Sequence, residues 1–251
     1  MRYLVISDIH SNLEALQTAL AAAPEHDFVL NLGDVVGYGA SPNEVVKIAK
    51  ELNGPIVRGN HDKACSGLGD TFGFNAVADR AVSWTVETLT PENRDWVRRL
   101  EHGPVNIPQF AGGQCVHGSP IDEDDYLLSS AAAFEAFRDD KTQLTFYGHT
   151  HVQGGYVLRN GYVEQVRPKY TTATNEETWE MPLQDDGRYL INPGSIGQPR
   201  DGDWRAGFAL FDSEAKVVKF YRVPYPVEVA QHRILAAELP EYLAVRLRTG
   251  R

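Results

Sequence analysis

The chain has 251 residues, of which 42% are hydrophobic and 23% charged, as is ordinary for a soluble globular enzyme with one large domain. Its formal net charge of −10 argues against general nucleic-acid binding, because contacts with phosphate backbones require excess positive charge. No apolar run approaches the roughly 18 residues of a membrane helix, and the short apolar stretch at the N-terminus ends in Asp8, unlike a signal peptide. We therefore expect a cytoplasmic protein without membrane contact.

The first two-thirds of the chain alternates short β-rich runs with helical stretches, which is typical of an α/β sheet protein. Strands are expected at residues 3–7, 28–32, 55–58, 105–110, 114–117 and 144–147. Helices are expected at residues 13–23, 42–52, 74–89, 91–100 and 131–137.

The last third is richer in β patterns and ends with a helix. Strands are expected at residues 152–158, 162–166, 189–191, 207–211 and 217–223, and the helix at 227–239, before Pro240. The polar stretch around 168–187 is rich in Thr and Glu, and we interpret it as a hairpin or loop insertion without an assigned role. No repeat or long linker interrupts the chain, so a single domain over 1–251 is expected. Cys65 and Cys115 form no CxxC pair and are expected to be free thiols.

Five polar clusters fall at or near the ends of predicted strands. They are Asp8-Ile9-His10, Gly33-Asp34, Gly59-Asn60-His61-Asp62, His117-Gly118 and Gly148-His149-Thr150-His151. In open α/β sheets, ligands collect outside the carboxyl ends of the strands, so the five clusters can converge on one cleft. Asp8 and His10, like His149 and His151, are spaced to point the same way on an extended segment.

The side chains of these clusters form a mixed set of nitrogen and oxygen donors. Such a set without thiolate suits Mn, Fe, Zn, Co or Ni better than Mg or Ca. Seven candidate ligands are too many for one tetrahedral ion and about right for two ions that share a carboxylate. They are Asp8, His10, Asp34, Asn60, His117, His149 and His151.

In their order along the chain, these clusters resemble the motifs of the calcineurin-like metallophosphoesterases: D-x-H, G-D, G-N-H-[DE], H and G-H-x-H. The resemblance covers roughly residues 3–225 and implies a four-layer α/β/β/α sandwich with two mixed β-sheets. It also implies that Asp8, His10 and His151 hold one divalent metal ion, that Asn60, His117 and His149 hold a second, and that Asp34 bridges them. Mn is the metal that we expect first.

Small departures from the pattern separate subgroups of this family. Tyr38 stands where the Ser/Thr protein phosphatases and dinucleoside polyphosphatases have a phosphate-binding arginine, and Asp62 replaces their Glu. Together with Asp8-Ile9-His10-Ser11-Asn12 and the stretch 192–200, these residues look like the small prokaryotic phosphodiesterase branch.

The resemblance implies hydrolysis of a small phosphodiester, such as a cyclic nucleotide, by a hydroxide held between the two ions. His61 is expected to donate a proton to the leaving oxygen or to stabilise its charge, with Asp62 either orienting His61 or serving as a structural cap. Three residues are candidate substrate contacts. Asn12 is a contact or a helix cap, Tyr38 a stacking residue or a loop anchor, and Arg200 belongs to a cleft rim or a plain turn.

Two enzymatic alternatives and one non-enzymatic alternative stay open at this point. The protein could act as a phosphomonoesterase or a nucleotide pyrophosphatase, or it could be a scaffold of the same fold. The sequence does not decide whether copies of the chain form a homo-oligomer.

Overall fold

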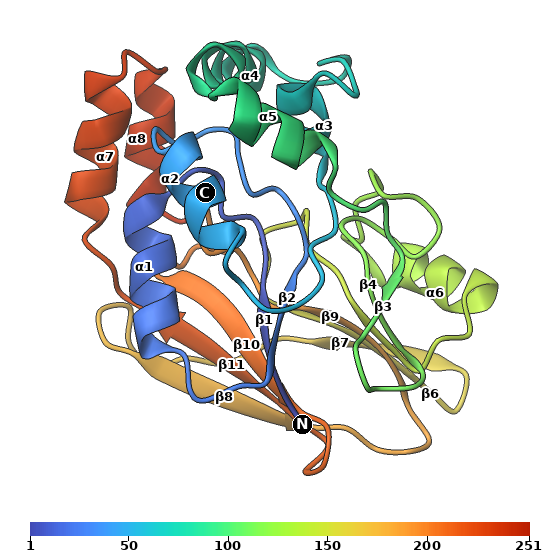
Figure 1. The fold of residues 1–251 in the computed structure, drawn as a ribbon. Coiled ribbons are helices and arrows are strands. Elements are labelled where there is room, and N and C mark those ends of the chain that lie inside the picture. The colour runs from blue at the N-terminus through green and yellow to red at the C-terminus, as the bar shows by residue number, and fades with distance from the viewer.

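Two mixed β-sheets lie face to face in the computed structural model, which describes residues 1–251 (Figure 1). The five-stranded sheet has the order β2-β1-β10-β11-β8, in which only β1 and β2 are parallel. Its strands are β1 (Arg2–Ile6), β2 (Phe28–Asn31), β8 (Glu177–Pro182), β10 (Ala206–Asp212) and β11 (Val217–Val223).

The six-stranded sheet has the order β3-β4-β5-β9-β6-β7, with β4, β5 and β9 parallel. Its strands are β3 (Val105–Asn106), β4 (Gly113–Cys115), β5 (Leu144–Phe146), β6 (Gly154–Arg159), β7 (Tyr162–Val166) and β9 (Arg188–Asn192). Both sheets therefore contain parallel and antiparallel neighbours.

The alternation of side chains along β1 explains why the sheets form the inner layers. Leu4 and Ile6 belong to the apolar cluster that includes the helices on one face. Tyr3 and Val5 belong to the cluster between the two sheets. Because successive residues of a strand point to opposite faces, β1 is covered on both sides.

Helices form the two outer layers (Figure 1). The helices that contribute to the first cluster are α1 (Leu13–Ala22), α2 (Pro42–Ala49), α3 (Asn60–Ser66), α4 (Ala76–Thr88), α5 (Pro91–Arg98), α7 (Val227–Ala236) and α8 (Glu241–Leu247). On the opposite side, α6 (Ser130–Asp139) packs Ala133, Ala136 and Phe137 against Tyr156 and Leu190 of the six-stranded sheet. The predicted α/β/β/α sandwich with two mixed sheets is confirmed.

Three local predictions differ from the structure. The expected strand at 55–58 is reduced to isolated bridges from Ile56 and Val57. Helix α3 begins within the Gly59-Asn60-His61-Asp62 cluster, and α8 follows Pro240; neither helix was expected. The polar stretch 168–187 contains β8, which pairs with β11 along six residues and extends the five-stranded sheet.

Two further observations concern the whole chain. Cys65 and Cys115 are buried and free, as expected. None of the helices has the length and apolar character needed to span a membrane.

Candidate metal centre

All five polar clusters meet in one place. Four of them follow the carboxyl ends of β1, β2, β4 and β5, and the fifth forms the first turn of α3. The six acidic and histidine side chains among the predicted ligands are buried, whereas Asn60 is half-buried. The structure thus brings together all seven predicted ligands: Asp8, His10, Asp34, Asn60, His117, His149 and His151.

The ligand atoms form two groups that share one carboxylate. The first group is Asp8, His10, Asp34 and His151, and the second is Asp34, His117 and His149. Asp34 Oδ2 lies 3.5 Å from His10 Nε2 and 3.4 Å from His117 Nε2. Asn60 joins the second group, because its Oδ1 lies 3.3 Å from His117 Nε2. The arrangement matches the division into two sites that the resemblance implied, with Asp34 between them.

Hydrogen bonds to backbone carbonyls orient the four imidazole rings. The Nδ1 atoms of His10, His117 and His151 lie 3.2, 2.7 and 2.6 Å from the carbonyl oxygens of Val36, Leu32 and Gln198. His149 uses its other nitrogen, since Nε2 lies 3.1 Å from the Asp124 carbonyl oxygen. In a neutral ring, the N–H that donates to a carbonyl leaves the other nitrogen unprotonated and turned toward the centre, which is the tautomer that binds a metal.

The donor set fits two divalent cations. His10 Nε2 and His151 Nε2 are 3.0 Å apart, and His117 Nε2 and His149 Nδ1 are 3.1 Å apart. In these tautomers each pair brings two nitrogen lone pairs face to face, an arrangement that a cation between them stabilises. One oxygen of the buried Asp8 carboxylate has no hydrogen-bond partner in the protein. Mixed imidazole and carboxylate donors are typical of sites for Mn, Fe, Co, Ni or Zn.

The pKa values of the rings show how strongly the centre attracts positive charge. Burial lowers the pKa of His149 to about 3, which favours the neutral ring that binds metals. Burial also lowers the pKa of His117, but the carboxylates of Asp34 and Asp8 outweigh this effect and raise it to about 10. A shared buried carboxylate thus stabilises a cation at this position.

The backbone around the centre adopts an unusual conformation. Five of the ligands have a positive φ: Asp8 (52°), His10 (47°), Asp34 (53°), His149 (63°) and His151 (57°). The left-handed region costs a non-glycine residue about 1 kcal/mol or more. The extended geometry expected for Asp8 to His10 and for His149 to His151 is therefore wrong. Both pairs reach the centre from tight left-handed turns.

Gly59 is required by the close approach of two clusters. A Cβ atom at this position would lie 2.1 Å from Asp34 Oδ1. Asp34 Oδ1 accepts a hydrogen bond of 2.9 Å from the backbone N–H of His61. The glycine therefore lets the first turn of α3 hold the shared carboxylate from the main chain.

Comparisons with known proteins agree with this geometry. The calcineurin-like phosphoesterase superfamily domain matches residues 1–216. The chain belongs to this superfamily. As a calcineurin-like metallophosphoesterase, it is similar over 98% of its length to an uncharacterised protein of Methanocaldococcus jannaschii, with 35% identity and 97% of that protein covered.

Solved structures show the same relationship. A metallophosphoesterase from Sphaerobacter thermophilus superposes with a TM-score of 0.83 and 38% identity, covering 100% of this chain and 99% of the other. A hypothetical protein from Pyrococcus horikoshii OT3 shares the fold, with a TM-score of 0.74, 21% identity and coverage of 100% and 98%. The family resemblance drawn from the five clusters is confirmed.

In this metallophosphoesterase, His61 lies beside the ligands without belonging to either group. Its ring centroid is 4.2 Å from that of Tyr38, 4.8 Å from that of Phe74 and 4.9 Å from that of His10. Its Nδ1 atom is buried and has no hydrogen-bond partner. Burial lowers the pKa of His61 to about 4, so the ring is neutral at pH 7.

Asp62 does not orient His61. Its two carboxylate oxygens accept hydrogen bonds from the backbone N–H groups of Val36 (3.1 Å) and Gly59 (3.0 Å). As the third residue of α3, Asp62 reaches back to the residue before the helix, as acidic residues at this position commonly do. Of the two roles considered for Asp62, the contacts match the structural cap.

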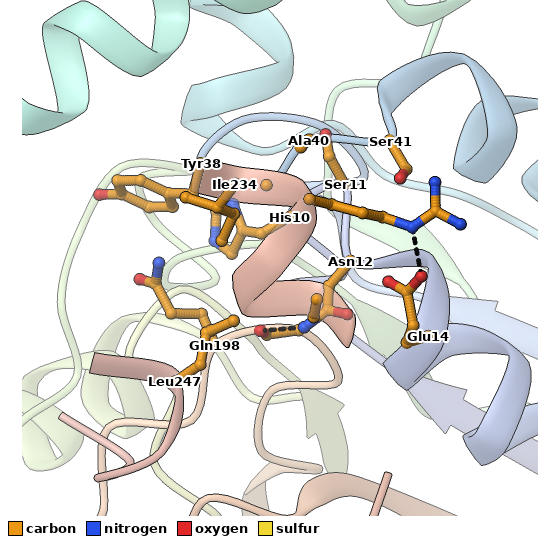
Figure 2. A pocket seen from close by; sticks show the side chains of 14 residues that line it. His10, Ser11, Asn12, Glu14, Tyr38, Ala40, Ser41, Gln198, Ile234 and Leu247 are labelled. Carbon is orange, nitrogen blue, oxygen red and sulfur yellow. Dashed lines mark hydrogen bonds and ion pairs between the residues drawn. The ribbon is translucent and has the colours of Figure 1, made fainter. Parts of the chain in front are cut away.

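Asn12 likewise serves the fold. Its Oδ1 accepts a hydrogen bond from Ala15 N–H at the start of α1, and its Nδ2 also donates to the Tyr225 hydroxyl (3.3 Å). The bond from Nδ2 to the Gly197 carbonyl (2.9 Å) is dashed in Figure 2. Both amide hydrogens are thus used within the protein. The expected contact of Asn12 with a substrate has no free donor to make it.

Arg200 lies close enough to the centre for its charge to lower the pKa of His10, His61 and His151, and Tyr38 supports it. The Arg200 guanidinium lies 5.7 Å from the centroid of the Tyr38 ring and donates from Nη2 to the Tyr38 hydroxyl (3.4 Å) and to Gln198 Oε1 (3.0 Å). Arg200 forms no ion pair, and its Nε is buried without a partner. Tyr38 is therefore the anchor, and Arg200 keeps its charge available.

One functional segment was missed in the sequence. This segment is the loop 119–126, which contacts His149 twice. The Asp124 carbonyl binds the His149 ring, and the Tyr126 ring stacks on His149 with centroids 3.7 Å apart. Lys63 of α3 holds this loop through Glu123 (3.0 Å) and Asp124 (2.5 Å). The run of acidic residues that pairs with Arg58 and Lys63 is a weak signal, because the partners lie about sixty positions apart in the chain.

Proposed function

We propose that this metallophosphoesterase hydrolyses small phosphodiesters, with cyclic nucleotides as representative substrates and Mn²⁺ as the preferred metal. The observation that carries the proposal is the pair of ligand groups joined through Asp34. When bound at such a centre, two divalent cations activate a water molecule and neutralise charge on the phosphoryl oxygens.

The protein's own residues position the reacting phosphate. Arg200 offers one guanidinium that is supported by Tyr38 and Gln198 and is free of ion pairs. A guanidinium binds phosphate oxygens through parallel N–H donors. A phosphodiester carries one negative charge and a monoester close to two, so a single arginine favours the diester.

His61 is placed to assist the leaving group. It is buried beside the first ligand group, and its Nδ1 is not committed to any protein acceptor. A neutral imidazole donates one N–H, and a donor aimed at the departing oxygen stabilises the charge that develops there. Tyr38 and Phe74 pack against the ring and restrict its rotation.

The assay that tests the proposal compares bis-p-nitrophenyl phosphate with p-nitrophenyl phosphate, with added Mn²⁺ and with chelator. We expect kcat/KM for the diester to exceed that for the monoester by at least about tenfold, and chelator to abolish both activities. A panel of 2′,3′- and 3′,5′-cyclic nucleotides then identifies the preferred diester. A preference for the monoester would overturn the proposal in favour of a phosphomonoesterase.

A further inference from the structure

A cleft of about 620 Å³ opens beside the metal centre. Its walls come from β6, β7, the loop 200–203 and the segment 168–173. This volume lies within the range of sites for small organic ligands. The segment 168–173 is the start of the polar stretch to which the sequence assigned no role.

The cleft adjoins the site of the predicted ligands, none of which lines it. It begins at Thr150, which stands between His149 and His151, and at Arg200, whose backbone N–H donates to the His151 carbonyl (3.1 Å). A molecule with a phosphate at the metal centre therefore has room to extend along the cleft.

The acidic residues of the cleft are neutralised within the protein. Asp201 pairs with the buried Arg222, and Asp203 pairs with the buried Arg205 at 2.6 Å. Arg222 also donates to Gln153 Oε1 at 3.1 Å. Asp201, Asp203 and Arg222 line the wall, and with Arg205 behind it these four residues contribute no free charge.

Two other arginines of the cleft have no acidic partner. Arg200 lies at the end next to the metal centre, and Arg167 follows the last residue of β7. Arg167 is exposed and forms neither an ion pair nor a hydrogen bond with the protein. In a chain with a net charge of −10, this leaves a cleft with two free positive charges.

The cleft also presents polar groups on an apolar floor. Tyr147 and Tyr156 are each only 3% exposed, and neither hydroxyl forms a hydrogen bond with another protein group. Buried tyrosines usually find a partner for the hydroxyl. Here a hydrogen-bond partner for either hydroxyl would have to be a molecule bound in the cleft.

We propose that this cleft binds the non-reacting arm of the diester, and that this arm carries a second phosphate recognised by Arg167. The substrate class is then a linear dinucleotide with a terminal phosphate. A cyclic nucleotide has a single phosphate, which the metal centre and Arg200 occupy, and it leaves Arg167 unused. The inference rests on the proposed phosphodiesterase function.

The kinetic test uses the Mn²⁺-loaded enzyme with two dinucleotides, pApA and ApA, which differ only in the 5′-phosphate. We expect a lower KM for pApA. Arg167→Gln should raise the KM for pApA roughly tenfold and leave kcat unchanged, because Arg167 lies outside both ligand groups and acts on binding. The KM for ApA should stay as in the wild type.

The matched control is Lys169→Gln, which removes an equal charge two residues away from a side chain that does not line the cleft. It should leave the KM for both dinucleotides unchanged. Equal KM values for pApA and ApA in the wild type, or equal effects of the two variants, would overturn the inference.

A binding measurement separates this inference from the proposed function. Calorimetric titration of the metal-free protein with pApA and with ApA, in chelator, involves no turnover. Tighter binding of pApA that Arg167→Gln abolishes supports the cleft even if no diester is hydrolysed. If diesters are hydrolysed but pApA and ApA bind equally well, the cleft proposal is wrong and the proposed phosphodiesterase function is unaffected.

Discussion

The two ligand groups around Asp34 share a carboxylate but differ in how they are held. In the first group, Asp8, His10 and His151 are at most 1% exposed. Backbone carbonyls from Val36 and Gln198 fix the two rings. Every atom that orients this group belongs to the interior of the protein.

The second group borders the surface. Asn60 is half-buried, and His149 stacks on Tyr126, which is 50% exposed. The carbonyl that orients His149 belongs to Asp124, in a loop held by ion pairs with Lys63 and Arg58. Donor chemistry alone would make the groups similar, but His149 takes its orienting contact from a surface loop, so we expect the second group to be the more adjustable. We expect tighter metal binding at the first group.

The largest effect should come from the residue that the two groups share. Asp34→Asn removes the common charge, and we expect loss of both ions and a fall in turnover of bis-p-nitrophenyl phosphate by at least about a thousandfold. Elemental analysis after loading with Mn²⁺ measures ions per chain, and circular dichroism verifies the fold. Two ions retained in this variant would contradict the sharing of Asp34.

His61→Ala should separate metal binding from turnover. The variant is expected to keep both ions, because His61 is in neither group, yet to lose about a hundredfold or more in kcat. The loss should be greater for diesters with poor leaving groups. Near-normal turnover across a series of leaving groups would rule out the assigned role of His61.

Lys63→Met should weaken one group only. Without Lys63, Asp124 loses its ion pair while Glu123 keeps its pair with Arg58. We expect the affinity for the second ion to fall about tenfold, as is common when a contact behind a ligand is lost. A Mn²⁺ titration followed by electron paramagnetic resonance resolves the two binding steps. The control is Lys50→Met, which breaks an ion pair with Glu92 between α2 and α5. An equal change at both steps would remove the distinction between the groups.

The smallest effect on catalysis is expected for Asn12, which caps α1 and belongs to neither ligand group. Asn12→Ala removes the cap of α1 and should lower the free energy of unfolding by about 1 kcal/mol, with kcat and KM unchanged. Urea denaturation and the diester assay measure the two quantities. A raised KM would restore Asn12 as a substrate contact.

The sequence predicted which polar residues would come together because the signal for each cluster is local. Each cluster interrupts an apolar strand abruptly, and strand ends meet at one edge of a sheet. The layers follow from the alternation of side chains along the strands. In β1, Leu4 and Ile6 face the helices, whereas Tyr3 and Val5 face the other sheet.

What the sequence did not predict depends on partners far along the chain. β8 is polar on its exposed face and places only Trp179 and Met181 among the apolar residues between the sheets. Helix α3 is only seven residues long and begins in a glycine-containing cluster that looks like a turn. The cap formed by Asp62 was one of two roles considered, and its bonds to Gly59 and to Val36, 26 positions away, separate them.

The left-handed turns at five of the ligands have a consequence for protein engineering. The geometry of such a binding site depends on the backbone conformation as much as on the identity of the side chains. Grafting the seven side chains onto another sandwich protein would supply the same functional groups but would not orient them toward a common centre. A transplant would have to carry the connecting turns and the glycine beneath them as one piece.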